Sequence, residues 1–144
     1  MGSSQHPLID QAYQARRNGD RQGALALYRQ AAAELADIDP VATASAVRHA
    51  ADLHAELGES EAALQAYKQA WRLYLTLDPA PELDMANCRR PMALWEEQYG
   101  GRFAALILWR EARTLYEKAA VVMGYDLQSA FDECDRHIAA LLGN

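Results

Sequence analysis

Residues 57–70, with the sequence LGESEAALQAYKQA, decide the fold of this chain. Gly58 favours the end of one helix, and Ser60 with Glu61 is expected to cap the start of the next. Small and aromatic residues then recur at helical spacing on one face. These residues are Ala63, Tyr67, Ala70 and Tyr74. A small residue lets two helix backbones approach, and an aromatic residue one turn later fills the space between them. The stretch therefore predicts the turn and second helix of a helix pair.

The same pattern occurs twice more in the chain. Gly58 has a counterpart at Gly19, 39 residues earlier, and another at Gly100, 42 residues later. The earlier copy continues with Ala24, Tyr28, Ala31 and Leu35, and the later copy with Ala105, Trp109, Ala112 and Tyr116. Three matched copies predict an all-α protein built as a helical repeat array.

The three copies resemble tetratricopeptide repeats (TPRs), with repeat 1 at residues 6–39, repeat 2 at 40–78 and repeat 3 at 79–123. The segment DPVATASAVRHAADLHAELGESEAALQAYKQA is most similar to the longer-helix repeats of the kinesin light chain type. Val47 and Ala51 replace the aromatic residue and the glycine of the ordinary first helix. The resemblance implies a right-handed α-solenoid over one domain, residues 1–144, whose first helices line a concave groove.

Local signals predict the helix boundaries. Asp20 is a good N-cap, and Asp39-Pro40 offers a capping carboxylate followed by proline at the first helical position. Asp78-Pro79 is expected to repeat this device at the start of the fifth helix. Pro91 lies inside that helix and cannot donate a backbone hydrogen bond, so we expect either a kink or a new helix start there. The inward face of this helix is expected to carry Met85, Cys88, Met92, Trp95 and Tyr99.

The last stretch, residues 126–142, is predicted to be a capping helix with one apolar and one polar face. Repeat arrays need such a helix because their last helix pair leaves an apolar surface. The prediction therefore totals seven helices, namely three TPR-like pairs and the C-terminal cap. Residues 1–5 are expected to be loose, and a helix is expected to start at His6 and Pro7.

Composition excludes several classes of function. The 144 residues carry a net charge of −6, with 20 acidic residues against 14 basic ones, which argues against a nucleic-acid partner. No apolar run approaches the ~20 residues that span a bilayer, and no signal peptide is recognisable, so we expect a cytoplasmic protein without a membrane partner. The preference for arginine over lysine is typical of a GC-rich bacterial genome. Cys88 and Cys134 are expected to be reduced.

No pattern in the sequence predicts a catalytic, cofactor-binding or metal site. His49 and His54 are five residues apart and do not share a helix face as a metal-binding pair would. Gly100-Gly101 is a helix–helix turn and not a phosphate loop. We therefore expect that the protein is not an enzyme and uses no cofactor.

The resemblance to TPRs implies that a partner peptide or helix binds in the concave groove. Eight residues are the principal candidates for contacting it. They are Tyr13, Arg16, Arg17, Arg48, His49, Asp52, Arg90 and Leu94. Arg48 and Arg90 occupy equivalent places in adjacent repeats, so they are candidates for binding a carboxylate of the partner. The alternative is that Arg48 pairs locally with Asp52 and that Arg90 is solvated.

Two functions follow from these observations. The first is a non-catalytic protein–protein interaction module. The second is a self-associating structural unit that forms a homodimer through an apolar surface. The identity of a partner cannot be read from the residues.

Overall fold

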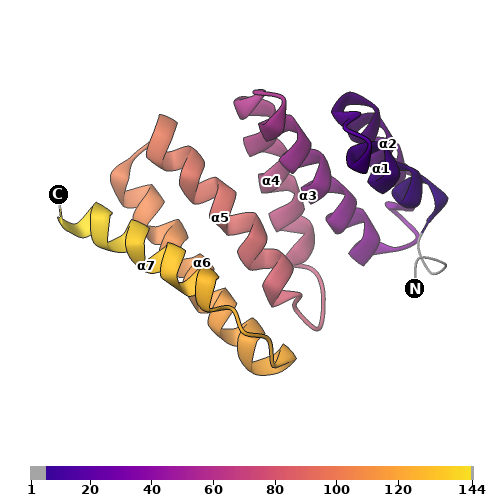
Figure 1. The fold of residues 1–144 in the computed structure, drawn as a ribbon. Helices are drawn as coiled ribbons and strands as arrows, with labels where there is room; N and C mark the ends of the chain where they lie inside the picture. Colours follow the sequence, from indigo (N-terminus) through magenta and orange to yellow (C-terminus); the bar gives the residue numbers. More distant parts are fainter. Residues whose placement is uncertain (1–5, 144) are drawn as a thin grey trace. The chain divides into compact units, whose positions relative to one another are not determined.

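A computed structural model describes residues 6–143 (Figure 1). All of the regular structure in this range is α-helical, with seven helices and no strand, as the sequence predicted. The helices are α1 (Pro7–Arg17), α2 (Arg21–Leu35), α3 (Pro40–Glu56), α4 (Ser60–Tyr74), α5 (Glu82–Tyr99), α6 (Arg102–Met123) and α7 (Gln128–Gly143). The expectation for residues 1–5 lies outside the described residues. Every helix within residues 6–143 is too short or too polar to cross a lipid bilayer.

The chain divides into two compact units, the first ending at Leu77 and the second beginning at Asp78. Helices α1–α4 form unit 1, and each of them packs on the next in chain order (Figure 1). Helices α5–α7 form unit 2, in which α6 packs on both α5 and α7. The single three-repeat domain expected from the sequence stays a prediction.

The core of unit 1 consists of the small and aromatic residues that the repeat pattern singled out. Ala24 and Ala31 are fully buried, so α2 can approach its neighbours closely at these two small residues. Tyr28 fills the space between these alanines and is also buried. The equivalent α4 residues Ala63, Tyr67, Ala70 and Tyr74 are buried as well. The predicted inward faces of α2 and α4 are therefore confirmed.

Two of the predicted helix caps are confirmed. The Asp20 carboxylate accepts a hydrogen bond from the backbone N–H of Gly23 at 2.8 Å. The Asp39 carboxylate accepts one from the N–H of Ala42 at 3.1 Å, and Pro40 is the first residue of α3. Each contact satisfies one of the backbone donors that the first turn of a helix leaves unpaired.

The predicted cap of α4 was wrong by one residue. Ser60 is the first residue of the helix, Glu59 occupies the N-cap position, and Glu59 makes no side-chain capping bond. The Glu59 carboxylate instead lies 2.7 Å from Nδ1 of His54. Its longer side chain reaches back to α3, which a short capping side chain does not do. The helix ends at Tyr74.

The predicted start of α5 at Asp78-Pro79 was also wrong. The helix begins at Glu82, after an N-cap at Pro81. The sequence has a second proline two residues after Pro79, and the residue before a proline is disfavoured in helical conformation. Ala80 precedes Pro81, so the chain cannot enter the helix at Pro79.

Helix α5 continues through Pro91 without a break, so the new helix start that the sequence allowed at this proline does not occur. Met85, Cys88 and Met92 are buried as predicted. Tyr99 was predicted to face inward but is 53% exposed. It is the last residue of α5, and its ring lies against Trp95 of the same helix, with ring centroids 5.2 Å apart.

The ends of α6 and α7 agree closely with the sequence analysis. Helix α6 stops at Met123 because Gly124 adopts a left-handed conformation with φ of 69°, which favours glycine. The predicted capping segment forms α7, and its Cys134 is fully buried against α5 and α6. Unit 2 therefore has a core of its own. Its buried members are Ala86, Ala93, Trp109, Ala112, Tyr116 and Cys134.

Candidate functional site

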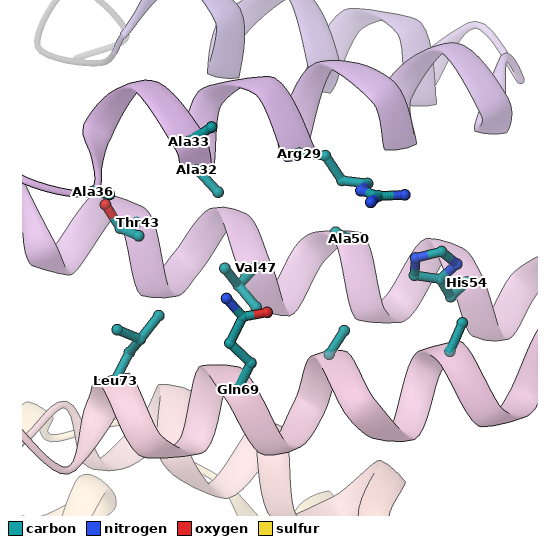
Figure 2. A pocket seen from close by; sticks show the side chains of 12 residues that line it. Arg29, Ala32, Ala33, Ala36, Thr43, Val47, Ala50, His54, Gln69 and Leu73 are labelled. Atoms are coloured by element: carbon teal, nitrogen blue, oxygen red, sulfur yellow. The ribbon is translucent and has the colours of Figure 1, made fainter.

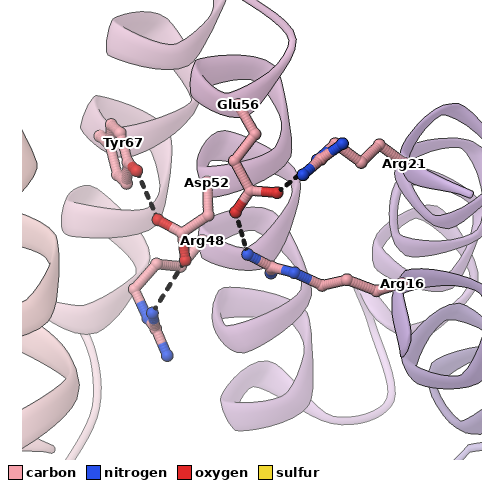
Figure 3. A network of polar contacts seen from close by, with 6 residues as sticks. All are labelled: Arg16, Arg21, Arg48, Asp52, Glu56 and Tyr67. Carbon is pink, nitrogen blue, oxygen red and sulfur yellow. Dashed lines mark hydrogen bonds and ion pairs between the residues drawn. The ribbon is translucent and has the colours of Figure 1, made fainter. Parts of the chain in front are cut away.

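Unit 1 carries a polar network on the face of α1 and α3 (Figure 3). Arg16 and Arg21 both contact the carboxylate of Glu56, and Arg21 Nε lies 3.2 Å from Glu56 Oε1. These side chains are partly exposed, so each ion pair contributes little stability by itself. Together they tie the end of α1 and the start of α2 to the end of α3.

The second part of the network surrounds Asp52. The Tyr67 hydroxyl donates a hydrogen bond to one carboxylate oxygen of Asp52. Arg48 Nη1 lies 3.3 Å from the other carboxylate oxygen. Arg48 Nε also donates to the hydroxyl of Tyr74 at 3.2 Å. Burial raises the pKa of Asp52, against the opposing effects of the Tyr67 hydrogen bond and of Arg48. The local Arg48–Asp52 pair considered in the sequence analysis is confirmed.

His49 is a structural residue in this face. Its ring stacks on Tyr28, with centroids 5.0 Å apart and planes at 19°. Its Nδ1 atom is buried and has no hydrogen-bond partner among residues 6–143. Burial, together with the positive charges of Arg48 and Arg16, lowers the pKa of His49 to about 4. The imidazole is therefore neutral at pH 7.

Tyr13 and Arg17 are the candidates in unit 1 that remain open to solvent. Tyr13 is 53% exposed, and the guanidinium of Arg17 lies 5.8 Å from the centre of its ring. An aromatic side chain with an adjacent arginine is typical of residues that contribute strongly to protein interfaces. Arg16, Arg48 and Asp52, by contrast, already make intramolecular polar contacts.

The two candidates in unit 2 lie under α7. Arg90 contacts Glu133 through two hydrogen bonds, of 2.5 and 2.7 Å, and these lower the pKa of that carboxyl. Leu94 packs against the core that includes Cys134. The alternative in which Arg90 is simply solvated is therefore wrong. Sequence analysis missed the pair because Arg90 and Glu133 are 43 residues apart.

An apolar groove on another face of unit 1 was not anticipated (Figure 2). It has a volume of about 570 Å³ and lies between α2 and α4 over α3. Its lining residues are Arg29, Ala32, Ala33, Ala36, Thr43, Val47, Ala50, His54, Ala62, Ala66, Gln69 and Leu73. Thr43 and Leu73 lie at one end and His54 at the other (Figure 2).

The groove owes its depth to alanine. Six of its twelve lining residues are alanines, whose side chains end at Cβ and leave space between the helices. Arg29 is the lining residue with a permanent charge, and it has no ion pair within the described part of the chain. The signal in the sequence was the alanines that lie beside the inward faces of α2 and α4, such as Ala33 and Ala62.

Neither surface has the features of a metal centre. Within residues 6–143, no group of three or more His, Cys, Asp and Glu side chains lies close enough together to hold a metal ion. Comparison with protein-family models gives no match to this chain, and comparison with curated proteins gives no significant relative.

Proposed function

We propose that the protein is a non-catalytic protein–protein interaction module built from TPR-like repeats. The recurrence of the same buried alanine and aromatic positions in α2, α4 and α6 supports a repeat array. A right-handed solenoid and a cytoplasmic bacterial setting belong to the same proposal. Both come from the resemblance and the composition described above.

The groove between α2 and α4 is the observation that carries this proposal. It is open, mostly apolar and large enough for several side chains of a partner. Alanine walls leave room for bulky groups, so the partner fits best if it presents leucine, methionine or phenylalanine. An amphipathic helix provides such a row at i, i+3, i+4 and i+7. We therefore propose an amphipathic helix as the bound segment.

The charge of Arg29 adds a second requirement for the partner. This side chain lines the groove and is exposed, and the other lining residues are apolar or carry no permanent charge. A carboxylate on the bound helix beside its apolar row would pair with Arg29 and fix the direction of binding. The proposed ligand is thus an amphipathic helix with an acidic flank.

The experiment selects binders from a display library of helical peptides whose apolar and flanking positions are randomised. Affinities of the selected peptides are then measured for the native chain, for Ala33→Leu combined with Ala62→Leu, and for Arg29→Glu. Both alanines are exposed on the groove walls, so the larger side chains fill the groove without entering the core.

Binding should fall by about tenfold or more in both variants, because the leucines occupy the space that the partner's apolar side chains need and Arg29→Glu removes a charge-assisted contact. Ala55→Leu is the matched control, since Ala55 is exposed on α3 and does not line the groove. Selected peptides that bind all variants equally, or a library that yields no binder, would contradict the proposal.

The face of α1 and α3 remains a further part of the proposal. Exposed Tyr13 and its neighbour Arg17 offer an aromatic anchor on the predicted concave side. Replacing Tyr13 by alanine would weaken peptides that bind this face and leave peptides in the α2–α4 groove unaffected. Comparing Tyr13→Ala with the groove variants therefore distinguishes binding at the face of α1 and α3 from binding in the α2–α4 groove.

Self-association is the second candidate function, and exposed apolar residues of α6 favour it. Val121 and Val122 are 84% and 77% exposed, and Phe103 and Ile107 are exposed nearer the start of the helix. Exposed apolar patches often mark protein interfaces. Light scattering over a wide concentration range tests this candidate. A mass that rises with concentration, and falls again in Val121→Ser with Val122→Ser, would support a homodimer.

A further inference from the structure

Helix α7 is held on unit 2 by ion pairs and hydrogen bonds as well as by apolar contacts. Of its 16 residues, Cys134 is the one that is fully buried. Its other apolar residues are partly exposed where they pack against α5 and α6. These include Phe131, Ile138 and Leu141, and Leu127 packs on the same core from the position just before the helix. Burial of apolar area therefore stabilises this helix less than it stabilises α5 and α6, each of which carries at least five buried residues.

Two carboxylates on either side of Cys134 connect α7 to two different helices. Glu133 makes two hydrogen bonds to Arg90 of α5, at 2.5 and 2.7 Å. Asp135 accepts from Arg113 of α6 at 2.6 and 3.4 Å. Arginine suits such bidentate contacts, which specify the position and orientation of a bound carboxylate and also stabilise its charge.

A third contact fixes the register of α7 one turn later. The His137 ring stacks on Trp109 of α6, with centroids 4.2 Å apart and planes at 17°. His137 Nδ1 also lies 2.7 Å from a carboxylate oxygen of Glu97, and the same oxygen accepts a hydrogen bond from the Trp109 indole. The α5–α6 face thus contacts two carboxylates, a small buried residue and an imidazole ring, each at a defined position along α7.

The contacts of α7 also allow the helix to dissociate from the α5–α6 face and bind it again. The Arg113–Asp135 pair is solvent-exposed, and exposed ion pairs hold helices weakly. Residues 124–127 connect α7 to α6 without helical structure and begin with Gly124 in the left-handed conformation. Helix α7 can therefore leave the α5–α6 face without unfolding α6. Elements held by few buried contacts open at a lower free energy than the rest of a fold.

We propose that the α5–α6 face is a binding site for an amphipathic helix whose two carboxylates flank a small buried residue, and that α7 occupies this site until a partner helix of that chemistry displaces it. The site lies in unit 2 and is separate from the α2–α4 groove. It does not depend on the function proposed for that groove.

The chain itself supplies the probe for this site, namely a labelled synthetic peptide of residues 126–143 with Cys134→Ala. The receptor is the full chain carrying Glu133→Lys and Asp135→Lys, which weaken the resident α7. The peptide should bind this receptor, and binding should fall by about tenfold or more when Arg90→Glu is added, because a two-pronged contact is lost. Peptides with Glu133→Lys or Asp135→Lys should bind less well than the matched control with Asp132→Lys, since Asp132 contacts Gln128 within α7.

The buried thiol of Cys134 reports displacement in the chain with its native α7. In a Cys88→Ala background, the rate of Cys134 modification by a thiol reagent should rise as peptide is added. Failure of the peptide to bind a weakened receptor that keeps its helicity would overturn the proposal.

Hydrogen exchange of the native chain provides a check that needs no variant. Exchange of α7 amides only through global unfolding would also overturn it.

Discussion

At the scale of single residues, the fold depends on where small side chains allow helices to approach. Ala63 is buried on α4, which packs on α3, while Gln65, two positions later, is exposed and contacts Glu61 along its own helix. Ala63→Leu should destabilise the protein by ~1–3 kcal/mol because the added methyl groups overpack the contact. Gln65→Leu should change stability by no more than about 0.5 kcal/mol. Denaturant unfolding of the two variants checks this, and equal stabilities would contradict the observed helix phase.

His49 gives unit 1 a predictable dependence on pH. Burial and the charges of Arg48 and Arg16 lower its pKa from 6.5 to about 4, so the unfolded chain binds the proton more readily than the folded chain between these values. The stability linked to His49 is complete above pH 6.5 and is lost as the pH falls toward 4, by up to about 3 kcal/mol. Asp52 has the opposite effect, because its raised pKa favours the protonated folded form.

Replacement of His49 by phenylalanine isolates this effect. The variant keeps a ring to stack on Tyr28 and removes the titrating group, while the contribution of Asp52 stays the same in both proteins. Thermal unfolding measured between pH 4 and 7 should show a smaller loss of stability in His49→Phe than in the native chain. Identical pH profiles would show that His49 is not held neutral.

At the scale of helices, the ends are set by local chemistry. Gly124 ends α6 with φ of 69°, and a Cβ at this position would meet no atom within 4 Å, so the requirement for glycine is conformational. Gly124→Ala should therefore destabilise unit 2 by about 1 kcal/mol. Gly101 also has open space around it but has φ of −122°. Gly101→Ala needs no left-handed conformation and should cost less than Gly124→Ala, although alanine is a poorer N-cap than glycine. Equal losses in the two variants would contradict a conformational role of Gly124.

Pro91 is the second helix-scale test. It lies inside α5, where it cannot donate a hydrogen bond to the preceding turn. Pro91→Ala restores that donor and should stabilise unit 2 by up to about 3 kcal/mol. Denaturant unfolding measures the change. A destabilised variant would indicate that the local shape imposed by Pro91 is needed for the packing of α5 on α6.

At the scale of the whole molecule, the chain has two cores, one in each compact unit. Leu53 is fully buried in unit 1, and Leu53→Ala should destabilise that unit by about 2–5 kcal/mol. Hydrogen exchange should then show a larger loss of protection in α1–α4 than in α5–α7. A uniform loss over all seven helices would show that the units unfold together.

Features that depend on nearby residues could be predicted from the sequence, and features that depend on distant ones could not. Asp20 and Asp39 cap helices that begin directly after them, and Gly124 stops the helix that precedes it. The Arg90–Glu133 contact depends on how α7 lies on α5, which no local pattern specifies. The α2–α4 groove likewise depends on the space between two helices that are separated by a third.

The central claim is that a partner helix binds the α2–α4 groove, and mapping of amide chemical shifts by nuclear magnetic resonance tests it most directly. A selected amphipathic peptide with an acidic flank is added to the isotope-labelled full chain. The largest shift changes should occur at groove residues such as Ala33, Ala50 and Ala66. Shift changes that cluster on the face of Tyr13 and Arg48, with none at the groove, would contradict it.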